Sequence, residues 1–416
     1  MRINVQWDSI APPERPRDFV AAVPSSPGYS WDALDLQVKR AVAAGLEPLL
    51  KVSGVPAWAR AAPLVGVSPN LVELNAFALA AATRYGGKTR GLPRVRYWQL
   101  WNEPNLNSFL TPQFDGTEPV SAGIYRAMVN EFARAVHQAH ADNLVVAGGL
   151  SPFTVSNKFF RSVAPLDFMR RMLCMSKGPN PHAICKTAVH FDVWSHHPYT
   201  SGGPTHSAVQ PDDVSLGDLP EMRELLDAAV RAGNIVASRP VRFWVTEFGW
   251  DTDPPDKHAL PVRLQARWTS EALYRMWLVG ISLVTWYLLR DDVAPPQGDF
   301  QTGLWYRGAG GLATDRPKPT LTAFRYPFVA YARNGRILCW GRTPWGRPAR
   351  VLIELTTGSG WRKVARVHAD RFGLFRTVVV SRATKGYLRA SSAGGRSLPF
   401  SLTVPPDRTV PPFGIG

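Results

Sequence analysis

Only three cysteines occur in the 416-residue sequence, too few for a disulfide-dense scaffold or a cysteine-rich zinc site. No apolar run reaches the length of a membrane-spanning helix, and no basic-then-apolar signal peptide opens the chain. Hydrophobic residues make up 45% of the sequence and charged residues 19%, which predicts a soluble globular protein with a large core. At this length, one large domain followed by a small one is expected.

Two of the cysteines are close in the sequence. Cys174 and Cys185 flank a turn-rich segment of Met, Ser, Lys, Gly, Pro, Asn and His, which could bring them together as a disulfide. Closing so short a loop would stabilise the fold by roughly 3 kcal/mol in the chain-entropy model. A disulfide here predicts an extracellular or cell-envelope location, since such compartments are oxidising. Cys339 lies in a strand-like stretch and is expected to be a small buried side chain.

Acidic residues are scarce at the C-terminal end. The segment 329–416 holds 15 Lys and Arg against 3 Asp and Glu, so most of the net charge of +16 belongs to it. Such a surface can simply be solvated, or it can attract an anionic polymer of the cell envelope. Nucleic acid is not an expected partner, because the arginines are scattered over strand-rich sequence with no recognisable binding motif. We also expect a monomer.

Strand-like and helix-like segments alternate over the first part of the chain. The strands are mostly continuous apolar runs, which is typical of a parallel sheet covered on both faces. No glycine-rich phosphate loop follows the first strand, and polar residues gather at strand C-termini, so an α/β fold of the (β/α)8 TIM-barrel type is predicted. The expected strands are 2–7, 47–52, 94–101, 144–147, 191–195, 241–246 and 281–286, and the expected helices 31–44, 70–85, 124–141, 165–174, 219–232, 261–279 and 318–324.

Helical periodicity disappears after residue 332. Short β-rich pieces such as 350–355 and 375–380 alternate there with Gly, Ser and Pro turns. This pattern predicts a small antiparallel β-sandwich. The predicted domains are therefore a catalytic barrel over 1–328 and a basic β-sandwich over 329–416.

Two glutamates stand at the ends of apolar strands. Glu103 follows Tyr-Trp-Gln-Leu-Trp-Asn and is followed by Pro104, and Glu247 follows Phe-Trp-Val-Thr. In a parallel barrel both strand ends lie on the same face, where a pair of carboxyl groups can hydrolyse a glycosidic bond. Each glutamate alone could equally be an ordinary strand-end residue. Tryptophans that suit sugar stacking also stand near strand ends: Trp7, Trp58, Trp101, Trp250 and Trp286.

These motifs make the region 1–328 resemble the clan A glycoside hydrolases, retaining (β/α)8 glycosidases that include families 5 and 39. The resemblance implies that Glu103 is the acid/base at the end of strand four and Glu247 the nucleophile at the end of strand seven. Asn102 then binds the sugar 2-hydroxyl, and Arg2 steadies the nucleophile. The motif His197-Pro198-Tyr199 matches a His-x-Tyr after strand six, in which His197 bonds to substrate and Tyr199 orients the nucleophile. Trp286 matches an aromatic residue that ends strand eight.

The same numbering makes the segment 2–7 strand two, so only seven barrel strands are found and the first β/α unit is expected to be absent from this sequence. We interpret Met1 as an internal start or truncation point, with which a signal peptide could have been lost. The first strand and its helix would then lie upstream.

The expected reaction is double displacement with retention on a β-linked oligo- or polysaccharide, which needs no cofactor. Substrate-binding roles are predicted for Arg2, Trp7, Trp58, Asn102, His197, Tyr199, Trp250 and Trp286. The histidines 190, 196 and 197 lack the spacing of a zinc site, so no metal is expected. The alternative is a non-catalytic or envelope-associated carbohydrate-binding protein on a degenerate hydrolase scaffold. The sugar, and exo or endo action, stay open.

Overall fold

The computed structural model describes residues 1–61, 68–156, 161–294, 298, 300–358, 360–406 and 408–409. The end of the predicted β-sandwich, 410–416, lies outside these residues. The chain forms two compact units, which are described separately. The first comprises Met1–Pro198, Ala208–Glu247 and Ile281–Thr285, and the second Tyr199–Ser207, Phe248–Gly280 and Trp286–Gly416. The division into domains at residue 328 stays a prediction.

Within the described residues, the first unit contains a seven-stranded parallel sheet. Its strands follow the order of the chain: β1 (Arg2–Gln6), β2 (Leu49–Ser53), β3 (Tyr97–Leu100), β6 (Leu144–Leu150), β8 (Val193–His196), β10 (Arg242–Val245) and β13 (Ile281–Val284). All six strand pairs are parallel. The order never reverses, as it would in a doubly wound sheet, and this confirms the predicted barrel-type α/β fold. All seven expected strands are present, with ends that differ by a few residues.

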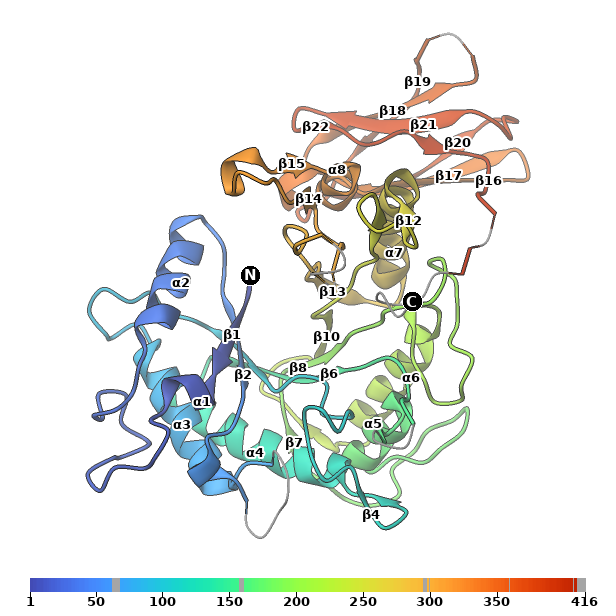
Figure 1. Cartoon of the computed structure of the whole chain (residues 1–416). Helices are drawn as coiled ribbons and strands as arrows, with labels where there is room; N and C mark the ends of the chain where they lie inside the picture. The colour runs from blue at the N-terminus through green and yellow to red at the C-terminus, as the bar shows by residue number, and fades with distance from the viewer. Residues whose placement is uncertain are drawn as a thin grey trace. The chain divides into compact units, whose positions relative to one another are not determined.

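Helices connect the strands, as the sequence predicts. The helices of the first unit are α1 (Trp7–Ile10), α2 (Asp32–Ala43), α3 (Leu71–Arg84), α4 (Ser121–Ala139), α5 (Pro165–Leu173) and α6 (Leu219–Arg231). Figure 1 shows α2 to α6 running along the outside of the curved sheet. Local signals set several helix ends. The Asn70 side chain accepts hydrogen bonds from the first free amides of α3, and Pro165 begins α5.

Strand residues of opposite parity face different layers. On β1, Ile3 and Val5 are buried while Asn4 and Gln6 are exposed. Facing side chains from five strands form an apolar cluster: Leu49, Tyr97, Val146, Val193 and Trp244. Two residues further along β2 and β3, in matching register, stand Lys51 and Gln99, both buried. The interior therefore changes from apolar to polar toward the carboxyl ends of the strands.

The second unit contains α7 (Val262–Leu278), α8 (Pro319–Arg325) and two antiparallel sheets. One sheet consists of β16 (Phe328–Arg333), β17 (Arg336–Arg342) and β20 (Leu374–Val380). The other consists of β18 (Arg350–Thr356), β19 (Arg362–His368), β21 (Tyr387–Ser392), β22 (Gly395–Arg396) and β23 (Phe400–Ser401). Alternate residues of these strands, with Tyr274 of α7, form one buried cluster that includes Cys339. Cys339 is a buried free thiol, as predicted.

Short elements complete the described chain. Four two-stranded pairs are β4 (Phe114–Asp115) with β5 (Glu118–Pro119), β7 (Val189–His190) with β9 (Ile235–Val236), β11 (Thr252–Asp253) with β12 (Leu260–Pro261), and β14 (Trp305–Tyr306) with β15 (Arg316–Pro317). Single 3₁₀ turns occur at η1 (Ala57–Ala59), η2 (Leu216–Asp218), η3 (Leu312–Thr314) and η4 (Pro344–Gly346). None of these elements is evident from the sequence pattern. Among the described residues, no helix combines the length and the apolar character needed to cross a membrane.

Candidate active site

The ends of β3 and β10 carry the two predicted carboxylates. Glu103 comes three residues after β3, and Glu247 two residues after β10. Hydrogen bonds between backbones continue past the strand ends. The Glu103 amide donates to the Gly149 carbonyl at 2.9 Å, and the Thr246 amide donates to the His196 carbonyl at 3.3 Å. The backbone that carries each carboxylate is therefore fixed by a hydrogen bond to the neighbouring strand, β6 for Glu103 and β8 for Glu247.

The backbone that carries Glu103 is in an unusual conformation. Trp101 and Glu103 have φ angles of 68° and 40°, a region that side chains other than glycine rarely adopt. Such strain persists only where the surroundings fix it, and it is concentrated at functional sites. The end of β6, which accepts the hydrogen bond from Glu103, requires a glycine at position 149, because a Cβ added there would lie 2.7 Å from Nε2 of Gln99.

His197 lies between the two carboxylates. Its Nδ1 is 3.0 Å from Oε1 of Glu103 and 3.8 Å from Oε2 of Glu247, so these two oxygens are at most about 6.8 Å apart. Its Nε2 is 3.1 Å from Oγ1 of Thr246. The imidazole is completely buried, whereas each carboxylate keeps 15% of its side-chain surface exposed. The two acids therefore meet at one rigid ring while remaining open to a small molecule.

Arg2 forms an ion pair with Glu247, a contact between its Nη1 and Oε1. Its Nε donates to Oε1 of Gln99 at 2.8 Å, and Nη2 donates to Oδ1 of Asn102 at 3.0 Å. Burial by itself would raise the pKa of the Glu247 carboxyl, but the positive charges of His197 and Arg2 outweigh it and hold that pKa well below its usual range. Glu247 is consequently ionised at neutral pH.

Asn102 is oriented by two cations. Its Oδ1 accepts from Arg2 at 3.0 Å and from Lys51 at 3.5 Å. Both partners can only donate, so the oxygen must face them and the amide NH2 must face away. Among the described residues, none hydrogen-bonds that NH2, which leaves two donors beside Glu103.

Lys51, Gln99 and Thr246 also belong to this site, although they are not among the residues predicted from the sequence. Burial, and then the charge of Arg2, lower the pKa of Lys51 to about 8, while Glu247 and Glu103 oppose the shift. Gln99 is fully buried and its Nε2 donates to Oγ1 of Thr246 at 3.4 Å. A signal existed, because a lone polar residue inside an apolar strand needs a buried partner.

Trp7 and Trp58 contact each other within a group of aromatic rings, and a substrate contact of Trp58 stays a prediction. Trp7 is completely buried and stacks on Phe77, with ring centroids 5.1 Å apart and planes at 13°. A side chain without exposed surface offers no platform to a sugar, so the structure corrects the predicted substrate role and places Trp7 in the core. Trp58 is half-buried, meets the edge of Trp7 at 6.4 Å and has the Arg15 guanidinium 5.2 Å from its ring centroid.

Tyr199, Trp250 and Trp286 belong to the second unit and gather around Phe248. The ring of Tyr199 stacks on Phe248 at 6.3 Å, while Trp250 and Trp286 meet it edge-on at 4.7 and 5.9 Å. Tyr199 and Trp250 are buried and Trp286 is half-buried. Their substrate contacts stay predictions.

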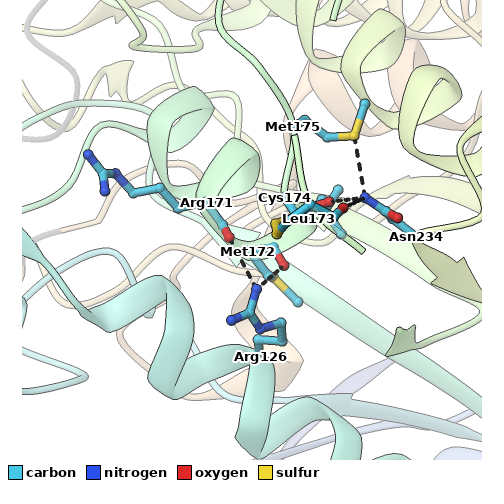
Figure 2. The surroundings of a disulfide bond; sticks show 8 residues. Arg126, Arg171, Met172, Leu173, Cys174, Met175 and Asn234 are labelled. Carbon is cyan, nitrogen blue, oxygen red and sulfur yellow. Dashed lines mark hydrogen bonds between the residues drawn. A yellow bond between two sulfur atoms is a disulfide. The ribbon is translucent and has the colours of Figure 1, made fainter. Parts of the chain in front are cut away.

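A disulfide joins Cys174 to Cys185, with Cα atoms 5.5 Å apart. Figure 2 shows its surroundings at the end of α5, where the side chains of Arg126 and Asn234 donate to backbone carbonyls. Asn234 Nδ2 donates to the Leu173 carbonyl at 2.8 Å and to the Cys185 carbonyl at 3.3 Å. One amide therefore fixes both sides of the cross-link. Elsewhere in the described part of the chain, no group of three or more His, Cys, Asp or Glu could hold a metal ion.

No protein-family model matches the chain, and no curated protein matches its sequence. The structure is similar to that of a conserved exported protein from Bacteroides fragilis, at 13% identity over 94% of this chain and 87% of that chain, with a TM-score of 0.50. A glucosidase from Croceicoccus marinus is matched at 12% identity over 91% of this chain and 86% of that chain, with a TM-score of 0.47. β-Glucuronidase 2 from Bacteroides uniformis is matched at 12% identity over 88% of this chain, which spans only 40% of that protein's chain, with a TM-score of 0.40. Two of these three proteins are glycosidases by name, and at such identities the likeness concerns the fold.

Proposed function

We propose that the protein is a retaining glycoside hydrolase that cleaves β-linked oligo- or polysaccharides by double displacement. The observation that carries this proposal is the pair of carboxylates that His197 contacts from one side, one of them ion-paired to Arg2. A glycosidase needs one carboxyl group that attacks as an anion and another that exchanges a proton with the leaving oxygen. The different surroundings of Glu247 and Glu103 suit these two roles.

In the first step an oxygen of Glu247 attacks the anomeric carbon while the glycosidic C–O bond breaks. Glu103 gives its proton to the departing oxygen. In the second step Glu103 takes a proton from water, whose oxygen bonds to the anomeric carbon as the bond to Glu247 breaks. Two protonation states of Glu103 are therefore required, and Nδ1 of His197 lies within hydrogen-bonding distance of its Oε1, at 3.0 Å.

The separation of the carboxylates bears on stereochemistry. Retaining enzymes hold the two groups roughly 5 to 5.5 Å apart, and inverting enzymes roughly 6.5 to 9.5 Å apart to admit a water molecule. The two oxygens that His197 contacts are at most about 6.8 Å apart, and this range includes the retaining separation. The NH2 of Asn102 is a suitable donor for a sugar hydroxyl next to the reacting carbon, because Arg2 and Lys51 hold its oxygen.

The test is hydrolysis of a panel of aryl β-glycosides and of plant and bacterial polysaccharides, with the anomer of the first product read by NMR. Glu247→Gln should remove activity by at least a thousandfold on every substrate. Glu103→Gln should spare the first step on substrates with good leaving groups and slow the second step, which added azide should restore. Unchanged activity in Glu247→Gln would overturn the assignment. Tight polysaccharide binding without turnover, by both the parent protein and Glu247→Gln, would favour the carbohydrate-binding alternative.

We further propose that the protein is a monomer that works outside the cell or in the cell envelope. The disulfide supports this location, because such bonds persist in oxidising compartments. The basic segment 329–416 is proposed as a β-sandwich domain that binds an anionic polymer. The substitution of both cysteines by serine should leave activity intact in a reducing buffer, while extraction of the natural protein from cells should show the cross-link intact. A fully reduced natural protein would contradict the location.

A further inference from the structure

A cavity of about 620 Å³ lies within the second unit, and none of its described lining residues belongs to the candidate active site. One wall is a single face of α7, formed by residues 263, 266, 267 and 270 at helical spacing. The other wall comes from the start of β19, the start of β21 and the segment 398–401 that enters β23. Its volume falls within the range of small-molecule sites, roughly 300 to 1,000 Å³.

Aromatic rings and arginines share the lining. Trp361 is half-buried, Tyr387 is 50% exposed and Phe400 is buried, so rings stand at the mouth and at the base. Arg263 and Arg267 are the charged residues among the described lining, and no carboxylate accompanies them there. Arg267 is paired with Glu271, which lies outside the described lining, so Arg263 is the cation that can attract an anion, and flat rings beside it suit the C–H face of a sugar.

The two arginines have different roles. Arg267 is fixed, because it pairs with Glu271 at 3.1 Å, donates to the Ser401 carbonyl at 2.8 Å and covers the Phe400 ring at 4.0 Å. Even so, its buried Nε has no hydrogen-bond partner in the described structure. Arg263 is exposed and forms no ion pair with any described residue, so its planar guanidinium group is free to bind a carboxylate or sulfate.

Trp361 is also held by an arginine on its face. The Arg389 guanidinium lies 4.1 Å from the centroid of Trp361 and is itself paired with Glu354 at 2.9 Å. Trp361 therefore has its position fixed before any ligand arrives. Preorganised rings bind at a lower entropic cost, which distinguishes a built site from a gap between elements.

We propose that this cavity binds an acidic saccharide unit, with the ring on Trp361 and Tyr387 and the acid group at Arg263. It would attach the protein to an anionic polysaccharide independently of the catalytic carboxylates. The excess of Lys and Arg over 329–416 would draw the polymer in, and the cavity would select its acidic sugars. A polynucleotide fits less well, because its charges lie on a continuous backbone rather than on the ring that enters the cavity.

The experiment measures binding by calorimetry to the full chain carrying Glu247→Gln, so the readout does not depend on turnover. The probes are trigalacturonate, sulfated maltotriose and maltotriose. We expect either acidic probe, or both, to bind at least tenfold more tightly than maltotriose, and the better one identifies the acid group. Arg263→Gln should weaken that probe about fivefold and flatten its salt dependence. Trp361→Ala should weaken it about tenfold.

Matched controls come from the same unit. Arg376→Gln removes another exposed arginine, from β20, and Trp345→Ala removes a tryptophan that is 73% exposed and also carries an arginine on its face. Both controls should bind the acidic probe as the parent does. Equal losses of affinity in Arg263→Gln and Arg376→Gln would show that the binding comes from diffuse surface charge and not from the cavity. Equal affinity for maltotriose, or tighter binding of a single-stranded oligonucleotide at the same cavity, would also overturn the proposal.

Discussion

Lys51 is the residue whose removal should make the protein more stable and less active. Its ammonium group is buried beside the Arg2 guanidinium, and its pKa is lowered from 10.5 to about 8. Because one pKa unit corresponds to about 1.4 kcal/mol, holding this charge in the folded protein costs about 3 kcal/mol at neutral pH. Lys51→Met keeps most of the side-chain volume and removes the charge. We expect its free energy of unfolding at pH 7 to exceed that of the parent by up to about 3 kcal/mol.

The pH dependence identifies the cause. Below pH 8 the lysine is protonated in both the folded and unfolded states, so the cost is fully present. Between pH 8 and 10.5 the folded protein releases its proton first, and the parent gains stability as pH rises. The advantage of Lys51→Met should therefore shrink across this window, as measured by urea unfolding at several pH values. Activity should fall about tenfold, because Asn102 loses one of the donors that orient it.

A matched control is Lys88→Met, since Lys88 is exposed and makes no ion pair among the described residues. It should change neither the free energy of unfolding at pH 7 nor its pH dependence. A Lys51→Met protein that is less stable than the parent at pH 7 would refute the reasoning. So would an advantage that stays constant from pH 7 to 10.5, since the gain would then come from packing.

Three further predictions concern the same unit. Arg2→Met should move the acid limb of the activity profile to higher pH, because it removes a cation that lowers the pKa of Glu247; a limb that does not move would show that the pair has no effect on ionisation. Gly149→Ala should destabilise the fold by about 2 kcal/mol or more and lower the turnover rate, because its φ is 62° and the new Cβ would meet Gln99. The control Gly233→Ala, at φ 75° with open space around it, should cost only about 1 kcal/mol. Equal losses in the two variants would show that the close contact with Gln99 has no effect. Replacing both cysteines of the disulfide by serine should cost at most about 3 kcal/mol in thermal unfolding, and less than 1 kcal/mol would mean that the reduced loop is already ordered.

The sequence predicts the sheet well because each strand is a short apolar run closed by a breaker. All seven strands of the sheet and every long helix fall where periodicity places them. The carboxylates are predictable for the same reason, since Glu103 and Glu247 directly follow such runs, and parallel strands bring their carboxyl ends to one edge. The short two-stranded pairs are not predictable, because two residues carry no periodicity.

Trp7 shows how a strand assignment that is correct to within one residue can still misplace a side chain. The sequence pattern predicts strand over the whole of 2–7, but β1 ends at Gln6 and α1 begins at Trp7. The alternation within β1 buries Ile3 and Val5 on one face, and Trp7 continues their parity. Residues of that parity pack against the helices, as the stacking on Phe77 of α3 confirms. Counting parity from Arg2, rather than proximity to a strand end, would have assigned Trp7 to the core.

Parity also explains why Lys51 escaped prediction and why its charge is needed. Lys51 has the parity of Leu49, whose side chain belongs to the interior cluster, so its ammonium group must lie inside the sheet. There it and Arg2 both donate to Oδ1 of Asn102. One of the two glutamates is a carboxylate at each stage of the proposed reaction: Glu247 before it attacks, and Glu103 while Glu247 is bound to the sugar as an uncharged ester. The ammonium group of Lys51 interacts with both glutamates, so it can stabilise the negative charge on Glu247 first and on Glu103 afterwards, which offsets the cost of burying Lys51.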